Sequence, residues 1–218
     1  MLALPLAFGS VLVTTAPSPA AADFPKPSAY PISWELNFKH GLPTRIVVDV
    51  PGSAVPLAYW YMTYTVTNNS DKEQNFLPQF ELLTDNGNLV RSDVGISKRV
   101  FDAIRNREHD KYLEPVTSVS GTLRLGEAEA RDSVAIFPEP MPRMGHFSIF
   151  VTGLSGEAVT LKHVNGQFQK VEQAEDMKDP KELVILRKTL QLNFFIRGDE
   201  VYPGEDEVNV GGEEWIMR

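Results

Sequence analysis

Short stretches in which apolar and polar residues alternate follow one another along most of the chain. The clearest stretch runs from Leu57 to Thr67. A period of two is typical of a β-strand with one face in the core, so one set of side chains is predicted to point inward and the other outward. The inward set is Trp60, Met62, Tyr64 and Val66, and the outward set is Tyr61, Thr63, Thr65 and Thr67.

Similar patterns predict further strands, and polar turns such as Asp85-Asn86-Gly87 separate them. These strands cover residues 34–38, 44–50, 76–84, 89–90, 116–125, 133–137, 146–152, 158–164 and 182–197. The last of them has an apolar face, which a solitary strand cannot bury. We therefore expect it to return to the main sheet, beside residues 34–38.

Residues 97–108 form the one predicted helix. Ser97 is a candidate N-cap, and Val100, Phe101 and Ile104 form a narrow apolar stripe. Many short strands are typical of a β-sandwich, and the 16 prolines and 15 glycines suit a chain that turns often. The sequence therefore predicts a mostly β fold: an immunoglobulin-like antiparallel β-sandwich with one short inserted helix, in a single domain over residues 23–218.

Residues 1–22 have the features of a signal peptide. An apolar stretch leads to Ala20-Ala21-Ala22, a small-residue pattern typical of a cleavage site, with Asp23 as the mature N-terminus. Because no Lys or Arg precedes the apolar stretch, there are two alternatives: the given start lies inside a longer signal peptide, or the stretch is a buried N-terminal strand. No later stretch approaches the ~20 apolar residues that span a bilayer. We expect an exported protein, periplasmic or extracellular, with no transmembrane segment in the mature chain.

The overall charge and the missing cysteines narrow the classes of function. Asp and Glu total 29 against 21 Lys and Arg, and this balance argues against a nucleic-acid partner, because phosphates need a basic surface. A chain without cysteine has no disulfide, thiolate nucleophile or cysteine-ligated zinc. Ser155 lies in a Gly-Leu-Ser-Gly-Glu run, so the G-x-S-x-G motif of serine hydrolases is incomplete. We expect a protein that is not an enzyme and has no cofactor.

The most distinctive local cluster contains two methionines and a histidine within six residues. They are Met141, Met144 and His146. Thioethers and imidazoles are ligands that Cu(I) selects, so these three side chains are candidates for a copper site. The alternative is that the methionines fill the end of the sandwich, because flexible side chains fit irregular gaps.

The C-terminal residues 198–218 hold seven acids and one base. In an exported protein, the acids at 199–200 and 205–207 are candidates for binding Ca²⁺, although their spacing matches no EF-hand loop. We expect a solvated acidic tail, with calcium binding as the alternative. The apolar run Trp215-Ile216-Met217 at its end predicts docking onto the body or onto a partner.

Several segments carry a resemblance to a known family. They are YMTYTVTNNS at 61–70, FELLTDNG at 80–87, GTLRLGE at 121–127 and SVAIF at 133–137. Over about residues 58–155 the chain resembles secreted bacterial immunoglobulin-like domains of unknown function, which include small proteinase inhibitors and extracellular accessory modules. The resemblance implies a sandwich in an exported protein and carries no catalytic residue onto this chain.

Together these patterns predict a binding, assembly or accessory module of the cell envelope, with an envelope or extracellular protein as its partner. Copper handling by the methionine and histidine cluster is the alternative. Loop-based proteinase inhibition, implied by the resemblance alone, is a third candidate.

Overall fold

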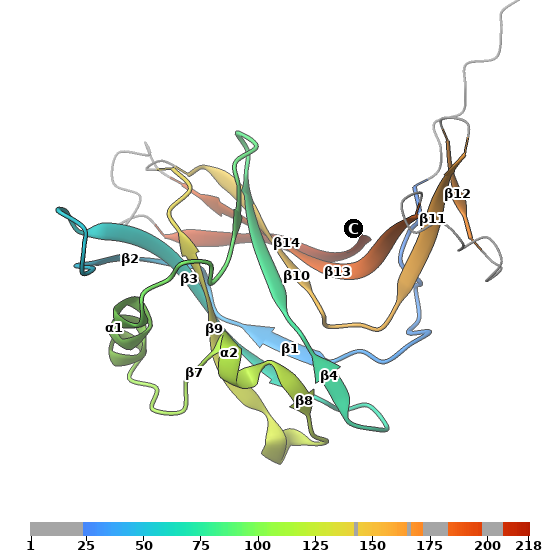
Figure 1. Ribbon diagram of the computed structural model, residues 1–218, viewed down its shortest axis with the longest axis horizontal. Coiled ribbons are helices and arrows are strands. Elements are labelled where there is room, and N and C mark those ends of the chain that lie inside the picture. The colour runs from blue at the N-terminus through green and yellow to red at the C-terminus, as the bar shows by residue number, and fades with distance from the viewer. Residues whose placement is uncertain (1–23, 142–143, 165–166, 172–182, 198–206) are drawn as a thin grey trace, which may run out of the picture.

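The computed structural model describes residues 24–141, 144–164, 167–171, 183–197 and 207–218. In these ranges the chain is mostly β, with two main sheets that are almost entirely antiparallel and two short α-helices. The sheets pack face to face, and the longer helix lies against the outer face of one of them (Figure 1). The predictions of a mostly β fold and of a sandwich are confirmed.

The first sheet is organised around β3 (Leu57–Thr67). β1 (Asn37–His40) pairs with the C-terminal half of β3, and β2 (Thr44–Val48) pairs with its N-terminal half. β9 (Arg131–Pro138) pairs along the other edge of β3, and β7 (Glu114–Pro115) adds a short parallel pair to β9. β3 is therefore the central strand of this sheet.

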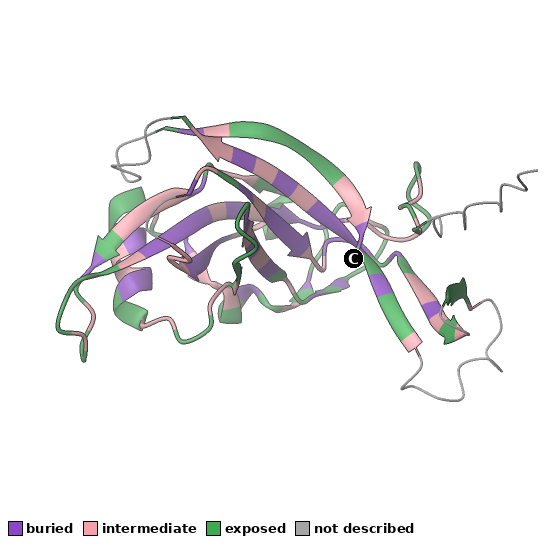
Figure 2. Cartoon of the chain, turned by 90° about the horizontal axis from the view of Figure 1, so that it is seen from above, coloured by how far each residue is buried: buried purple, intermediate pink, exposed green. Residues whose placement is uncertain are grey.

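The second sheet is organised around β13 (Leu183–Ile196). This strand pairs with three others: β11 (Ala158–Val164), β10 (His146–Thr152) and β14 (Val208–Met217). The remaining strands are β5 (Gln79–Thr84) beside β10, β6 (Leu89–Arg91) beside β5, and β12 (Gln167–Lys170) beside β11. Along β5 and the second half of β13, buried residues alternate with less buried ones, as a sheet with one inner face requires (Figure 2).

Short elements connect the sheets. They are α1 (Lys98–Glu108), α2 (Val116–Val119), a 3₁₀ turn at Glu127–Glu129, and a small ladder of β4 (Gln74–Phe76) with β8 (Gly121–Leu123). Helix α1 begins as predicted, because the Ser97 hydroxyl accepts a hydrogen bond from the backbone N–H of Arg99. Its predicted apolar stripe is buried.

The strand predicted over residues 116–125 is wrong in its first half. Residues 116–119 form α2, which follows Pro115 and ends where the N–H of Ser120 donates to the carbonyl of Val116. The β-branched residues of this segment favoured a strand. Val119, however, lies three residues after Val116, which is close to one helical turn, and the helix buries Val119 in the core. The described ranges therefore contain two helices, not the one that was predicted.

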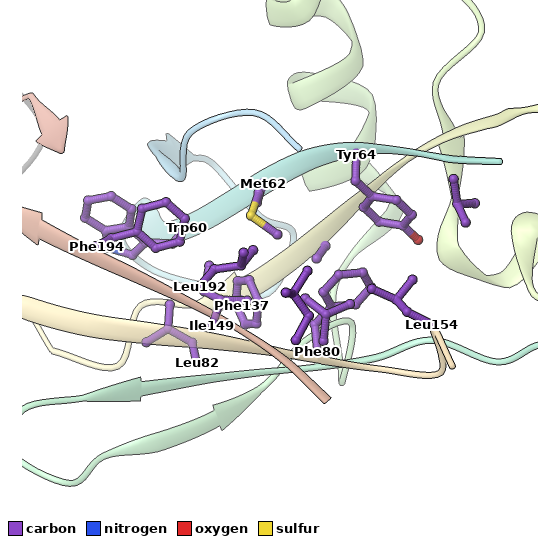
Figure 3. Close-up of a cluster of buried hydrophobic side chains, with 14 of the residues drawn as sticks. Trp60, Met62, Tyr64, Phe80, Leu82, Phe137, Ile149, Leu154, Leu192 and Phe194 are labelled. Carbon is purple, nitrogen blue, oxygen red and sulfur yellow. The ribbon is translucent and has the colours of Figure 1, made fainter. Parts of the chain in front are cut away.

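The inward set predicted for β3 is confirmed. Its four side chains are buried between the sheets. They meet apolar side chains of the second sheet, among them Phe80, Ile149, Leu192 and Phe194 (Figure 3). Aromatic rings make up much of this core, and the rings of Tyr64 and Phe80 lie 4.9 Å apart between centroids.

The outer face of β3 is also covered, which the alternation did not show. Tyr61 is only 2% exposed and packs with Val100 and Ile104 of α1 and with Ile136 of β9. A second apolar cluster forms there because α1 lies across this face (Figure 1). The direction predicted for Tyr61 is right, but the expected exposure to solvent is wrong.

The last long strand returns to the main body, as predicted, but not beside residues 34–38. That segment leads into β1 of the first sheet, whereas β13 lies in the second. Residues 208–217 of the C-terminal acidic segment pair with the edge of β13 as β14. Met217 is buried and Trp215 packs against the core, so the predicted docking of the C-terminus is confirmed.

Tyr61→Ala should destabilise the protein about as much as Trp60→Ala. Both side chains are buried, on opposite faces of β3, so each deletion removes a large aromatic side chain and should cost ~3–5 kcal/mol in the free energy of unfolding. Urea denaturation measures both losses. Tyr61→Phe is the matched control: it removes only the hydroxyl that donates to Glu108, and we expect a loss of ~1 kcal/mol. A Tyr61→Ala variant as stable as the parent would mean that α1 does not cover this face.

Ending the chain at Gly211 should destabilise the fold. This deletion removes Trp215, Met217 and Arg218, whose guanidinium lies 2.7 Å from Glu81 Oε2 and over the ring of Phe150. We expect a loss of ~3–5 kcal/mol. For a domain of this size the thermal midpoint then falls by roughly 10 °C.

A thermal melt of the shortened and the full chain measures this effect. The control is the double variant Glu213→Ala, Glu214→Ala, which changes two exposed side chains of the same strand and should melt within ~1 °C of the parent. Equal midpoints for the shortened and full chains would contradict the docking of β14.

Candidate functional site

A cavity of about 440 Å³ lies between α1 and the outer face of β9. We call it the α1 pocket. Its walls are mostly apolar and include Ile96, Phe101, Val116, Val134 and Ile136. The volume and the lining are typical of small-molecule sites, in which a few polar groups orient a ligand against apolar walls.

Asp93 is one of the residues that line the α1 pocket. Its backbone N–H donates to the carbonyl of Ile136 at 2.8 Å, which holds Asp93 at the open edge of β9. Its φ of 61° lies in the left-handed region, which residues other than glycine adopt rarely and which recurs at functional sites. Its Oδ2 is buried and has no hydrogen-bond partner among the described residues. Burial raises the pKa of this carboxyl to about 6, and hydrogen bonds with Ser92 and with the backbone of Ile136 offset part of the rise.

The other charged side chains of the pocket are paired with one another. Lys98 Nζ lies 2.7 Å from one oxygen of Asp102, and Arg105 Nη2 lies 3.4 Å from the other. The hydrogen bond from Lys98 is the main reason that the pKa of Asp102 is below its ordinary value. Asp93 is therefore the carboxyl that remains for a ligand.

The three side chains of the predicted copper site lie in different surroundings. Met144 is 1% exposed and belongs to the core between the sheets. Met141 packs against this core, with its sulfur 3.5 Å from Nδ2 of Asn86. His146 is exposed at the start of β10, where its ring stacks on Phe195. The positions of the methionines favour the gap-filling alternative, and copper binding stays a prediction.

Other predicted features lie partly or wholly outside the described ranges. Among the residues that the structure describes, no group of three or more His, Asp and Glu side chains is placed to hold a metal ion. Residues 198–206, with most of the calcium candidates, lie outside these ranges, and so does the predicted signal peptide at 1–22.

A buried ion-pair cluster, which we did not predict from the sequence, joins distant parts of the chain. Lys188 Nζ lies 2.5 Å from a carboxylate oxygen of Glu35 and 3.4 Å from one of Glu157, and it sits over the ring of Trp215. Burial alone lowers the pKa of Lys188, but the two carboxylates outweigh it and hold this pKa above its ordinary value. Lys188 lies two residues before Leu190 on β13, so both side chains point to the inner face of the sheet. A charged residue at an inward position was the signal in the sequence for this cluster.

A second candidate site projects from the sandwich. β11, β12 and residues 183–187 of β13 form a three-stranded extension, which we call the β-arm (Figures 1 and 2). At its base Leu161, Leu186 and Met217 form a small apolar cluster of their own. The arm also carries exposed apolar side chains: Phe168 at 52%, Val184 at 40% and Ile185 at 54%.

Asp93→Asn should stabilise the protein at pH 7.5. The carboxyl has a pKa of about 6 in the folded protein and an ordinary value of 3.8, so stability is fully present below pH 3.8 and is lost as the pH rises towards and through 6. An amide avoids this loss, and Asn tolerates the left-handed backbone. At 1.36 kcal/mol per pKa unit the gain approaches ~3 kcal/mol at pH 7.5 and vanishes near pH 4.

Urea denaturation at both pH values measures the gain. Asp102→Asn is the matched control, because it removes a carboxylate that is already paired and exposed to solvent; it should give no stabilisation at either pH. A gain from Asp93→Asn that is equal at pH 4 and pH 7.5 would show that ionisation of Asp93 is not its cause.

Within the described ranges, no helix has both the length and the apolar character needed to cross a membrane. No family model matches the chain, and no curated protein or solved structure is significantly similar to it. The function is therefore inferred from the α1 pocket and the β-arm themselves.

Proposed function

We propose that this protein is an exported, non-enzymatic binding module with an immunoglobulin-like sandwich, and that its β-arm binds a partner protein of the cell envelope or the extracellular space. The observation that carries the proposal is the exposure of Phe168, Val184 and Ile185 on a sheet that projects from the body. Phe168 and Val184 lie on one face of the arm and Ile185 on the other, and exposed apolar side chains grouped on one projecting element are typical of sites that contact other proteins.

The β-arm offers a partner an open strand edge. β12 pairs with β11 along one edge, and its other edge has no partner strand within the described ranges. All four of its residues are exposed. An edge strand presents a row of unpaired N–H and C=O groups, to which a strand of another protein can add.

The side chains beside this edge extend the contact. Leu161 lies opposite both Lys170 and Val184, so these three side chains share one face of the arm. Phe168, two residues before Lys170, joins them. A partner strand added to β12 would therefore lie next to an apolar face. We infer a partner that supplies an extended segment with apolar side chains.

Export and the immunoglobulin-like assignment rest on the sequence. The small-residue pattern Ala20-Ala21-Ala22 supports export. The resemblance over about residues 58–155 supports an immunoglobulin-like sandwich, and two packed antiparallel sheets agree with it.

Site-specific photocrosslinking in the native cells tests the proposal. The full chain carries p-benzoylphenylalanine in place of Phe168, and irradiation should give a crosslinked product whose second component is an envelope or extracellular protein. The matched control places the same photoreactive residue at Tyr112, which is 68% exposed and lies between α1 and β7, far from the β-arm in Figure 1.

Three outcomes would contradict the proposal. Equal crosslinking to the same protein from Tyr112 would show that the β-arm is not the contact. A product that contains only two copies of this chain would indicate self-association instead of a partner. A cytoplasmic partner would contradict export.

A further inference from the structure

The α1 pocket carries an inference that does not depend on the β-arm. Helix α1 buries Val100 and Ile104 against the sheet, yet beside them a cavity of about 440 Å³ stays open. Protein interiors are packed as densely as organic crystals, and voids larger than a water molecule are few. The cavity opens to solvent, so it is a surface pocket that a ligand can enter, and its apolar walls favour an apolar occupant.

The carboxyl of Asp93 adds a polar anchor to this cavity. A buried carboxylate oxygen without a hydrogen bond is costly, and such a group persists where a ligand supplies the missing partner. Oδ2 itself is shielded from solvent, so a ligand meets it only after a rotation about χ2, a torsion that is soft and roughly two-fold in aspartate. The left-handed backbone conformation of Asp93 is a second energetic cost at the same residue, and the hydrogen bond from its N–H to the carbonyl of Ile136 holds it in place.

The charges around the cavity determine the sign of the ligand. Lys98, Asp102 and Arg105 come from α1 and are paired with one another. The lining residues that β9 and residues 115–117 contribute carry no charge. The start of α1 is capped as well, since the Ser97 hydroxyl accepts one of its first N–H groups. The carboxyl of Asp93, which has hydrogen bonds with Ser92 and Ile136 but no cationic partner among the described residues, therefore favours a positively charged donor.

We propose that the α1 pocket binds a small amphipathic amine, with its ammonium group hydrogen-bonded to Asp93 and its apolar body against Phe101, Val134 and Ile136. A charge-assisted hydrogen bond in a partly desolvated site discriminates an ammonium from a hydroxyl by about tenfold or more in affinity. A carboxylate ligand would meet the Asp93 carboxylate and be repelled.

Three matched probes test this proposal: 4-phenylbutylamine, 4-phenylbutanol and 4-phenylbutanoate. Each is titrated at pH 7.5 into the ¹⁵N-labelled full chain, and amide chemical shifts are followed by NMR. The amine should shift the amides of Ile96, Phe101 and Val134 and bind about tenfold more tightly than the alcohol. The carboxylate should bind most weakly.

Two variants identify the group that recognises the amine. Asp93→Asn should bring the affinity for the amine down to that for the alcohol and leave the alcohol unchanged. Asp102→Asn, which removes a carboxylate from the same pocket, should keep the preference for the amine. A titration of the unmodified chain at pH 5, where a carboxyl with a pKa of about 6 is mostly protonated, should weaken amine binding about tenfold and needs no substitution.

The proposal is overturned if no probe shifts amides of the α1 pocket, if the carboxylate binds most tightly, or if the preference for the amine survives both Asp93→Asn and pH 5. These results leave the crosslinking experiment on the β-arm unaffected, because the arm and the pocket are separate parts of the molecule (Figure 1).

Discussion

An ammonium group inside a β-sandwich has to be compensated, and the cluster around Lys188 shows how this chain does it. Burying an unpaired charge costs far more than a typical contact contributes, so Lys188 requires its carboxylates. Glu35 comes from the segment before β1, Glu157 from the corner between β10 and β11, and Trp215 from β14. One buried charge therefore fixes the entry of the chain, the corner that leads to the β-arm, and the C-terminal strand.

The second constraint is that β3 is buried on both faces around Tyr59 and Tyr61. Its inner face forms the core between the sheets, and its outer face requires a cover, which α1 provides. A helix laid across a sheet does not fill all the space beneath it, and the α1 pocket is the part left open. The pocket and the β-arm lie at opposite ends of the molecule, so a ligand and a partner protein can be bound together (Figure 1).

Local sequence patterns predicted those strands and helices in which the side chains of one face all lie in the core. The strands at 57–67, 146–152 and 158–164 form as predicted, and Ser97 caps the predicted helix. The cover over Tyr61 could not be predicted, because tyrosine and threonine suit both solvent and a helix cover. β14 was missed because Gly211-Gly212-Glu213-Glu214 has little strand character, and its pairing depends on β13. Asp93 lies in an ordinary polar turn, and only the fold shows what surrounds it.

The length of β13 has a mechanical consequence. Its 14 residues extend about 46 Å and belong to the β-arm at one end and to the body at the other. A pull on the arm along this strand therefore loads the hydrogen bonds to β10 and β14 in shear, and these bonds have to break together. A perpendicular pull would open them one after another. Tension transmitted along the arm is thus shared across the widest part of the sheet, so the body resists a load in the one direction in which the arm extends.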